Sequence, residues 1–220
     1  MLLISMNILT KDENNKNIIL DSSKKHQIMM EWEKPYMEAC IQKLQPFVDV
    51  LEIGFGLGYS ATEIQKFPIK SYTVIECDVG AYQRALRWKE KYNHQINIIH
   101  DRWENVYKSL PKFDCLFFDD YDIKTLELCK IDNSIPCRNI NFIDKIKNNL
   151  KPTTKFSFYC ATNKNEIMKY KKQWIRFLGK KCSHIDFEEY DIDVPDNCKY
   201  IVDQILYCPL IKIKEIFNYY

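Results

Sequence analysis

The stretch Val48-Asp-Val-Leu-Glu-Ile-Gly-Phe-Gly-Leu-Gly-Tyr-Ser60 decides the fold. Its aliphatic and β-branched residues predict a parallel strand covered on both faces, and three alternate glycines then let the backbone come close to a ligand. Ser60-Ala-Thr-Glu-Ile-Gln65 predicts the start of a helix. A strand, a glycine turn and a helix N-terminus with free N–H groups together predict a nucleotide-type site.

The spacing of the glycines narrows the choice of ligand. The turn reads E-x-G-x-G-x-G, whereas a dinucleotide fingerprint reads G-x-G-x-x-G, so a nucleoside without a pyrophosphate is favoured. The next strand, Tyr72-Thr-Val-Ile75, ends on Glu76. Because α/β nucleotide folds use an acid at this distance to bind ribose hydroxyls, S-adenosylmethionine is favoured over NAD as the cofactor.

Length, charge and cysteine content limit the class of protein. The 220 residues suffice for one domain, which we place at 26–220 behind an N-terminal arm or lid at 1–25. The formal charge of +2 favours neither nucleic acid nor an anionic membrane as a partner. Nine cysteines without a C-x-x-C pair indicate reduced thiols in a cytoplasmic enzyme, and the apolar start without a basic leader does not predict a signal peptide.

Strand-like and helix-like segments alternate after the glycine turn. This order predicts an α/β fold with a parallel sheet covered by helices on both faces. Counting the segments gives a seven-stranded, mostly parallel sheet that ends in an antiparallel hairpin. The predicted strands are 48–53, 71–77, 96–101, 113–119, 155–160, 184–192 and 199–207, the predicted helices are 26–44, 79–92, 141–150 and 166–178, and the loop 120–138 is a possible lid.

Acids follow several of the predicted strands. In a parallel sheet the carboxyl ends of the strands meet at one edge, so we expect Gly54, Glu76, residues 101–103 and Asp119 around one crevice. Two acids after a buried strand are more often a solvated turn. However, two phenylalanines precede Asp119, which favours an enclosed carboxylate that needs a cationic or hydrogen-bonding partner.

Other motifs of the sequence also have plainer, structural interpretations. Glu33 beside Pro35 is equally consistent with a helix surface. The apolar residues around it would by default be core, although aromatic and thioether groups also suit a sulfonium cation. The four histidines show no metal-ligand spacing, so no metal site is expected, and no nucleophile motif occurs.

Several short motifs in one order carry a resemblance to a known family. The sequence resembles guanidinoacetate N-methyltransferase and the wider guanidino-methyltransferase group, which includes the arginine δ-N-methyltransferase of fungi. The match runs from about Met29 to Leu210. It rests on residues 29–37, 50–56, 75–77, 103–106, 113–119, 141–143, 151–152 and 194–200.

The resemblance implies a Rossmann-like class I methyltransferase that uses S-adenosyl-L-methionine, releases S-adenosyl-L-homocysteine, acts on a small guanidino molecule and is a monomer or homodimer. The cofactor contacts that it implies are Met29, Met37, Glu52, Gly54, Phe55, Gly56, Leu57, Glu76, Cys77, Asp78, Arg102 and Trp103. The catalytic residues that it implies are Asp119 and Glu33, and the substrate contacts are Glu33, Asp119, Tyr121, Thr162 and Asn163.

Some positions depart from the family's pattern. Where the family reads Tyr-Asp-Thr-Tyr-Pro, this chain reads Phe118-Asp-Asp-Tyr-Asp122, and an asparagine of the family is Ala161. The acids that would bind the guanidino group, Glu33 and Asp119, are kept, while the residues that would contact the rest of the substrate differ. Arginine, free or in protein, is therefore an alternative acceptor to guanidinoacetate, and a cofactor-binding protein without guanidino activity is a further alternative. The two added acids disfavour a nucleic-acid methyltransferase.

A mechanism follows from the chemistry of the guanidino group. A guanidinium is protonated up to a pKa above about 12, so the attacking nitrogen must lose a proton before it can accept a methyl group. We expect Asp119 to bind two guanidino hydrogens and to take that proton. Glu33 would hold the other edge of the planar group.

Overall fold

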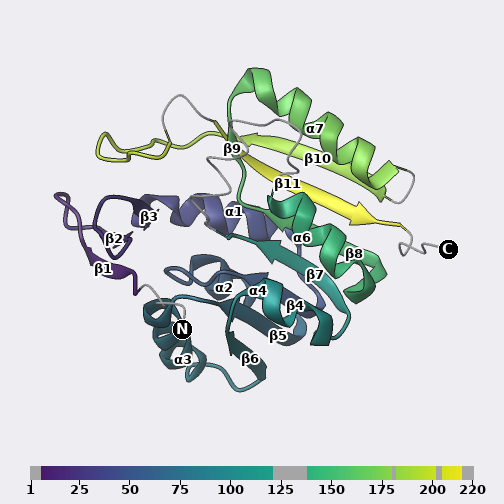
Figure 1. Ribbon diagram of the computed structural model, residues 1–220, viewed down its shortest axis with the longest axis horizontal. Coiled ribbons are helices and arrows are strands. Elements are labelled where there is room, and N and C mark those ends of the chain that lie inside the picture. Colours follow the sequence, from purple (N-terminus) through teal and green to yellow (C-terminus); the bar gives the residue numbers. More distant parts are fainter. Residues whose placement is uncertain (1–5, 121–137, 180–181, 202–204, 215–220) are drawn as a thin grey trace.

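The computed structural model describes residues 6–120, 138–179, 182–201 and 205–214. Seven strands form the main path of its central sheet, in the order β10-β11-β8-β7-β4-β5-β6 (Figure 1). The five strands from β8 to β6 in this order are parallel to one another, while β11 is antiparallel to its two neighbours, β8 and β10. The strands are β4 (Val48–Ile53), β5 (Ile69–Glu76), β6 (Gln95–His100), β7 (Phe113–Phe118), β8 (Leu150–Phe158), β10 (Cys182–Tyr190) and β11 (Ile205–Ile213), and the two-residue β9 (Ala161–Thr162) pairs with β11. The predicted fold class is confirmed.

Helices cover both faces of the sheet, and each face has its own apolar cluster. Successive residues of β4 point to opposite faces, so that Val50 joins one cluster and Leu51 joins the other. The first cluster packs against α1 (Lys34–Leu44), α2 (Tyr59–Ile64) and α3 (Val79–Lys89). The second packs against α4 (Trp103–Val106), α6 (Arg138–Ile146) and α7 (Lys164–Leu178), and the short 3-10 helices are η1 (Glu31–Glu33), η2 (Tyr107–Ser109) and η3 (Lys147–Asn149).

The N-terminal segment is more ordered than its composition indicates. Strands β1 (Ile8–Lys11), β2 (Asn17–Leu20) and β3 (Gln27–Met30) form a separate antiparallel sheet. An aspartate closes each hairpin: Asp12 accepts backbone N–H groups of residues 14 and 16, and Asp21 accepts those of residues 25 and 26. The pairing of β2 with β3 crosses the expected division between 1–25 and 26–220. Whether the segment acts as a lid stays a prediction.

Three predicted elements are misplaced, of which one is the strand expected at 155–160, observed as β8 at Leu150–Phe158. The helix expected at 26–44 is preceded by β3 and η1 and begins only at Lys34, with Pro35 in its first turn as expected. The final strand was expected at 199–207, but β11 occupies Ile205–Ile213. Because β11 lies between β8 and β10, its residues from Leu206 to Ile211 are all buried. A continuous apolar run, rather than alternation, was the correct signal.

Candidate functional site

The glycine turn after β4 packs tightly against two other segments. Gly54 has φ +84°, and a Cβ there would lie 2.1 Å from the carbonyl oxygen of Asp119, at the end of β7. Gly56 has φ +52°, and a Cβ there would lie 2.6 Å from the sulfur of Met29. Side chains are therefore excluded at both positions by backbone conformation and by contact. The turn brings β4, β7 and β3 together at the carboxyl edge of the sheet.

The N–H groups of residues 55 to 57 in this turn are occupied. Glu76, at the end of β5, accepts hydrogen bonds from Phe55 N at 2.7 Å and Gly56 N at 3.4 Å. The N–H of Leu57 points to the sulfur of Met29 at 3.3 Å. Since these donors already bind a carboxylate and a thioether, the turn is not a ready phosphate site. It presents an acid instead.

Glu76 is held in place by the same hydrogen bonds. Its second oxygen accepts the N–H of Asp78 at 2.7 Å, and burial raises the pKa of the Glu76 carboxyl. Asp78 caps α3 by accepting the N–H of Ala81 at 2.8 Å, and it also accepts the N–H of Asn7 at 2.6 Å. Cys77, between the two acids, is exposed. Glu76 and Cys77 thus border the edge of the sheet, while the Asp78 carboxylate is committed to structure.

Two predicted cofactor contacts lie in the interior. Glu52 has no exposed surface, and its two oxygens accept hydrogen bonds from the hydroxyls of Ser60 and Tyr72. Burial raises the pKa of Glu52 to about 7. Met37 also has no exposed surface and belongs to the core beside α1. The structure therefore does not bring Met37 to an accessible surface, and Glu52 braces the glycine turn from behind.

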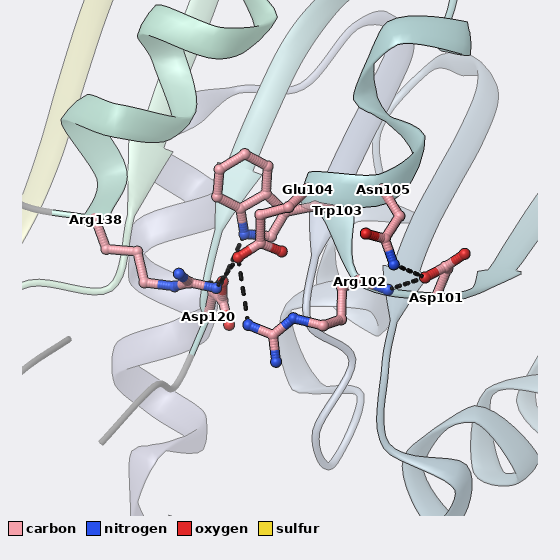
Figure 2. A network of polar contacts seen from close by, with 7 residues as sticks. All are labelled: Asp101, Arg102, Trp103, Glu104, Asn105, Asp120 and Arg138. Carbon is pink, nitrogen blue, oxygen red and sulfur yellow. Dashed lines mark hydrogen bonds and ion pairs between the residues drawn. The ribbon is translucent and has the colours of Figure 1, made fainter. Parts of the chain in front are cut away.

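Arg102 and Trp103 belong to a polar network at the start of α4 (Figure 2). The indole N–H of Trp103 donates to Asp120 at 2.7 Å, and its ring is buried. Arg102 is exposed and pairs with Glu104 at 3.3 Å. Arg138, the first residue of α6, binds both Asp120 and Glu104. The side chain of Trp103 is thus used within the protein, and Arg102 remains accessible.

Glu33 lies at the end of η1 in a largely dry environment, with 3% of its surface exposed. One of its oxygens accepts the N–H of Met30 at 2.7 Å and the hydroxyl of Tyr200. Burial raises the pKa of Glu33 to about 7, although these hydrogen bonds act in the opposite direction. The buried hydroxyl of Tyr159 has no hydrogen-bond partner of good geometry, and burial, followed by the charges of Glu33 and Asp119, raises its pKa.

Asp119 is surrounded by other acids. Burial raises its pKa well above the ordinary value, and the charges that add to this effect are, from the largest contribution down, the carboxylates of Glu33, Glu52, Asp120 and Glu76. Among the residues that the structure describes, only Asp120 in this group has an ion-pair partner. Glu33 and Asp119 therefore influence each other within a group of acids that suits a cation, and their joint role at one site stays a prediction.

The predicted contacts after β8 have structural roles. Thr162 lies in β9, which pairs with β11. The side-chain oxygen of Asn163 caps α7 by accepting the N–H of Glu166 at 2.9 Å. Tyr121 lies outside the described residues, as does most of the predicted loop 120–138.

Sequence reasoning missed three residues near the acids. Tyr200 stands in a motif that carries the family resemblance, so position alone could have pointed to it, whereas Tyr159 lies outside those motifs. Arg138 lies 18 residues from Asp120 along the chain, and no local pattern links the two. A cation beside so many acids was nevertheless to be expected, because buried carboxylates need partners.

The site fits the cofactor expected for this fold. Glycines without side chains leave the backbone bare beside Glu76, and an acid at the end of β5 can accept ribose hydroxyls. The occupied turn amides and the surplus of carboxylates favour a cationic ligand such as a sulfonium over a pyrophosphate.

In the described part of the chain, none of the helices is both long enough and apolar enough to cross a membrane.

Comparisons with known proteins agree with this assignment. The sequence matches the family model described as guanidinoacetate N-methyltransferase over residues 11–214. Protein arginine N-methyltransferase 2 of Saccharomyces cerevisiae is 27% identical over 217 residues, which cover 87% of this chain and 50% of that protein. The protein of the same name from Candida glabrata is 24% identical over 198 residues, which cover 87% and 44%. The chain spans about half the length of these curated relatives.

Solved structures share the fold at low sequence identity. TYW2 of M. jannaschii in complex with AdoMet has a TM-score of 0.57 at 15% identity, with 94% of this chain and 85% of that chain covered. N-methyltransferase NodS of Bradyrhizobium japonicum with S-adenosyl-L-homocysteine has a TM-score of 0.57 at 14% identity, with 84% and 89% covered. Since the family match covers most of the chain, this protein belongs to the guanidinoacetate N-methyltransferase family, within the S-adenosylmethionine-dependent methyltransferases.

Proposed function

We propose that this protein transfers the methyl group of S-adenosylmethionine to a nitrogen of a guanidino group. The observation that carries the proposal is the cluster of acids around Asp119, in which Glu33 and Glu76 have no ion-pair partner among the described residues. A guanidinium is a permanent, planar cation with five N–H donors, and carboxylates bind it in bidentate fashion. Such a ligand would supply the positive charge that this cluster lacks.

Asp119 is suited to act as the base. Attack requires that the guanidino nitrogen lose a proton, and a carboxyl with a raised pKa takes that proton more readily than an exposed aspartate does. Binding of the cation first favours the ionised form of Asp119. Asp119 then holds the nucleophilic nitrogen and accepts its proton while Glu33, fixed by Met30 and Tyr200, holds the opposite edge of the group.

The cofactor has a place beside these acids. Glu76 would accept the ribose hydroxyls, and the bare glycine turn with the exposed Cys77 would border the nucleoside. When bound, S-adenosylmethionine supplies an electrophilic methyl group on a sulfonium. The protein's own contribution is to align the nucleophile within about 3–3.5 Å and to exclude water from the buried carboxylates.

The first acceptor that we propose is guanidinoacetate or a small molecule like it, as the family description indicates. Arginine, free or in a protein, is the second candidate, because both curated relatives bear the name of protein arginine methyltransferases. A groove of about 340 Å³ lies beside η1, with Glu31 and Trp32 in its lining, and it does not include Glu33 or Asp119. It is otherwise lined by Asp12, Asn14, Lys16, Met30, Asp193, Val194 and Pro195.

An acceptor panel with a labelled methyl donor tests the proposal. The panel contains guanidinoacetate, L-arginine and an arginine-containing peptide, each beside its urea isostere: N-carbamoylglycine, citrulline or the citrulline peptide. We expect label in at least one guanidino compound and in none of the isosteres, because the ureas are uncharged. Cofactor binding without transfer to any guanidino compound would instead support a non-catalytic binding protein, and the proposal would be wrong.

A further inference from the structure

The Asp120 carboxylate adjoins the proposed base but is already paired. Its Oδ2 accepts the indole N–H of Trp103 and the Nε–H of Arg138, each at 2.7 Å. Figure 2 shows the side chains of Trp103 and Arg138 approaching the Asp120 carboxylate. The side chains of Asp120 and Arg138 are only 14% and 15% exposed, so water screens this pair much less than it screens a surface pair.

Arg138 is itself held by two further contacts. Its Nη2 donates to Glu104 at 2.7 Å, and its guanidinium lies 5.5 Å from the centre of the Trp103 ring. The network therefore joins the end of β7, the start of α4 and the start of α6. A planar guanidinium with several fixed donors suits such a three-way junction better than a lysine would.

We propose that Arg138 is a positioning residue for methyl transfer. Its pairing with Asp120 offsets that residue's negative charge and fixes the end of β7, so that Asp119 alone faces the acceptor as the base. This inference rests on the proposed function, because it assigns Arg138 a role in the same site. Asp120 stands where the family's pattern has threonine, and Arg138 pairs with this additional acid.

Asp120 and Arg138 act on Asp119 in opposite directions. Asp120 adds to the rise in the pKa of Asp119, and Arg138 opposes the charge of Asp120. Without Arg138, the loss of a nearby positive charge would disfavour ionisation of both Asp120 and Asp119. The titratable groups that face Asp119 from the surrounding elements are Glu33, Glu52, Glu76, Asp120 and Tyr159.

The test compares Arg138→Met with the double variant Arg138→Met/Asp120→Asn. The single variant leaves an uncompensated acid, whereas the double variant removes both charges. We expect Arg138→Met to lower kcat/KM at pH 7 about tenfold and to raise the pH at which activity is half-maximal by about one unit. In the double variant that midpoint should return to within about 0.3 unit of the wild type. Lys147→Met is the matched control. It removes an ion pair with Asp144 of α6, and it should change neither kcat/KM nor the midpoint.

A merely structural role would reduce activity without moving the midpoint. The proposal is overturned if Arg138→Met keeps the wild-type midpoint, or if the double variant fails to restore it. Arg138→Gln, which keeps an N–H donor for Asp120 but has no charge, serves the same test if the methionine variant does not fold.

A second readout uses no acceptor and so separates this inference from the proposed function. An acid whose folded-state pKa is raised makes the protein less stable as pH rises through that pKa. Between pH 5 and pH 8, the melting temperature of Arg138→Met should therefore fall several degrees more than that of the wild type, and that of the double variant should not. Parallel falls in all three proteins would contradict the inference even if methyl transfer is found.

Discussion

Replacing Asp119 with asparagine is expected to lower kcat for methyl transfer about 10³-fold at saturating acceptor. Asparagine has nearly the same size but takes no proton, and its amide N–H groups would face the N–H groups of the guanidinium. The substitution adds no backbone strain, because the N–H of residue 119 still donates to the carbonyl oxygen of Ile53. Single-turnover transfer of a labelled methyl group measures the chemical step directly.

Controls separate this loss from unfolding. Asp119→Asn should bind S-adenosyl-L-homocysteine with nearly wild-type affinity, as measured by calorimetry, since the acid lies on the acceptor side of the proposed site. Asp186→Asn makes the same change of charge in a partly buried pair with Lys43 and should leave kcat unaltered. A kcat for Asp119→Asn within tenfold of the wild type would show that Asp119 is not the base.

Replacing Gly54 with alanine is expected to be the most destabilising single change in the site. The new methyl group would lie 2.1 Å from the carbonyl oxygen of Asp119, on a backbone with φ +84°. The oxygen belongs to the backbone of a buried strand end, so it cannot move aside cheaply. We expect a loss of about 3 kcal/mol or more in the free energy of unfolding, measured by denaturant titration.

Gly179 provides a control with a positive φ and no close neighbour. It has φ +55° at the end of α7, and a Cβ there would meet nothing within 4 Å. Gly179→Ala should therefore cost only the conformational term, on the order of 1–3 kcal/mol, with no added clash. If the two alanine variants lost equal stability, close packing of the glycine turn against β7 would not be the reason for glycine at position 54.

The parallel core of the fold was predictable because its signals are local. Strands buried on both faces read as continuous apolar runs, and β4, β5 and β7 lie within two residues of their expected bounds. The N-terminal sheet was not predictable in the same way. Its four-residue strands are too short for periodicity, and β1 has no buried residue. The turns that define it depend on side-chain hydrogen bonds of Asp12 and Asp21.

The site was predictable to the extent that sheet geometry determines it. Parallel strands bring their carboxyl ends together, so the grouping of Glu76 and Asp119 followed from their positions after strands. The partners of these acids did not follow. Tyr200 reaches Glu33 across 167 residues of sequence, and Glu76 accepts an N–H of the glycine turn that precedes it by 21 residues. Contacts of this kind depend on packing that no local pattern encodes.

Proton release on acceptor binding tests the central claim, which is that buried acids hold a guanidinium. Burial raises the pKa of Glu33 to about 7, so this acid is about half protonated at neutral pH in the free protein, and burial raises the pKa of Asp119 in the same direction. A bound cation favours their ionised forms. Binding must then expel protons into the buffer.

The measurement is a calorimetric titration at pH 7, in the presence of S-adenosyl-L-homocysteine, in two buffers that differ in ionisation enthalpy. The ligands are the best acceptor from the panel and its urea isostere. We predict release of about one proton or more for the guanidino compound, less for the Glu33→Gln variant, and weak binding without proton release for the isostere. Equal affinity for the two ligands, with heats that do not depend on the buffer, would contradict the claim.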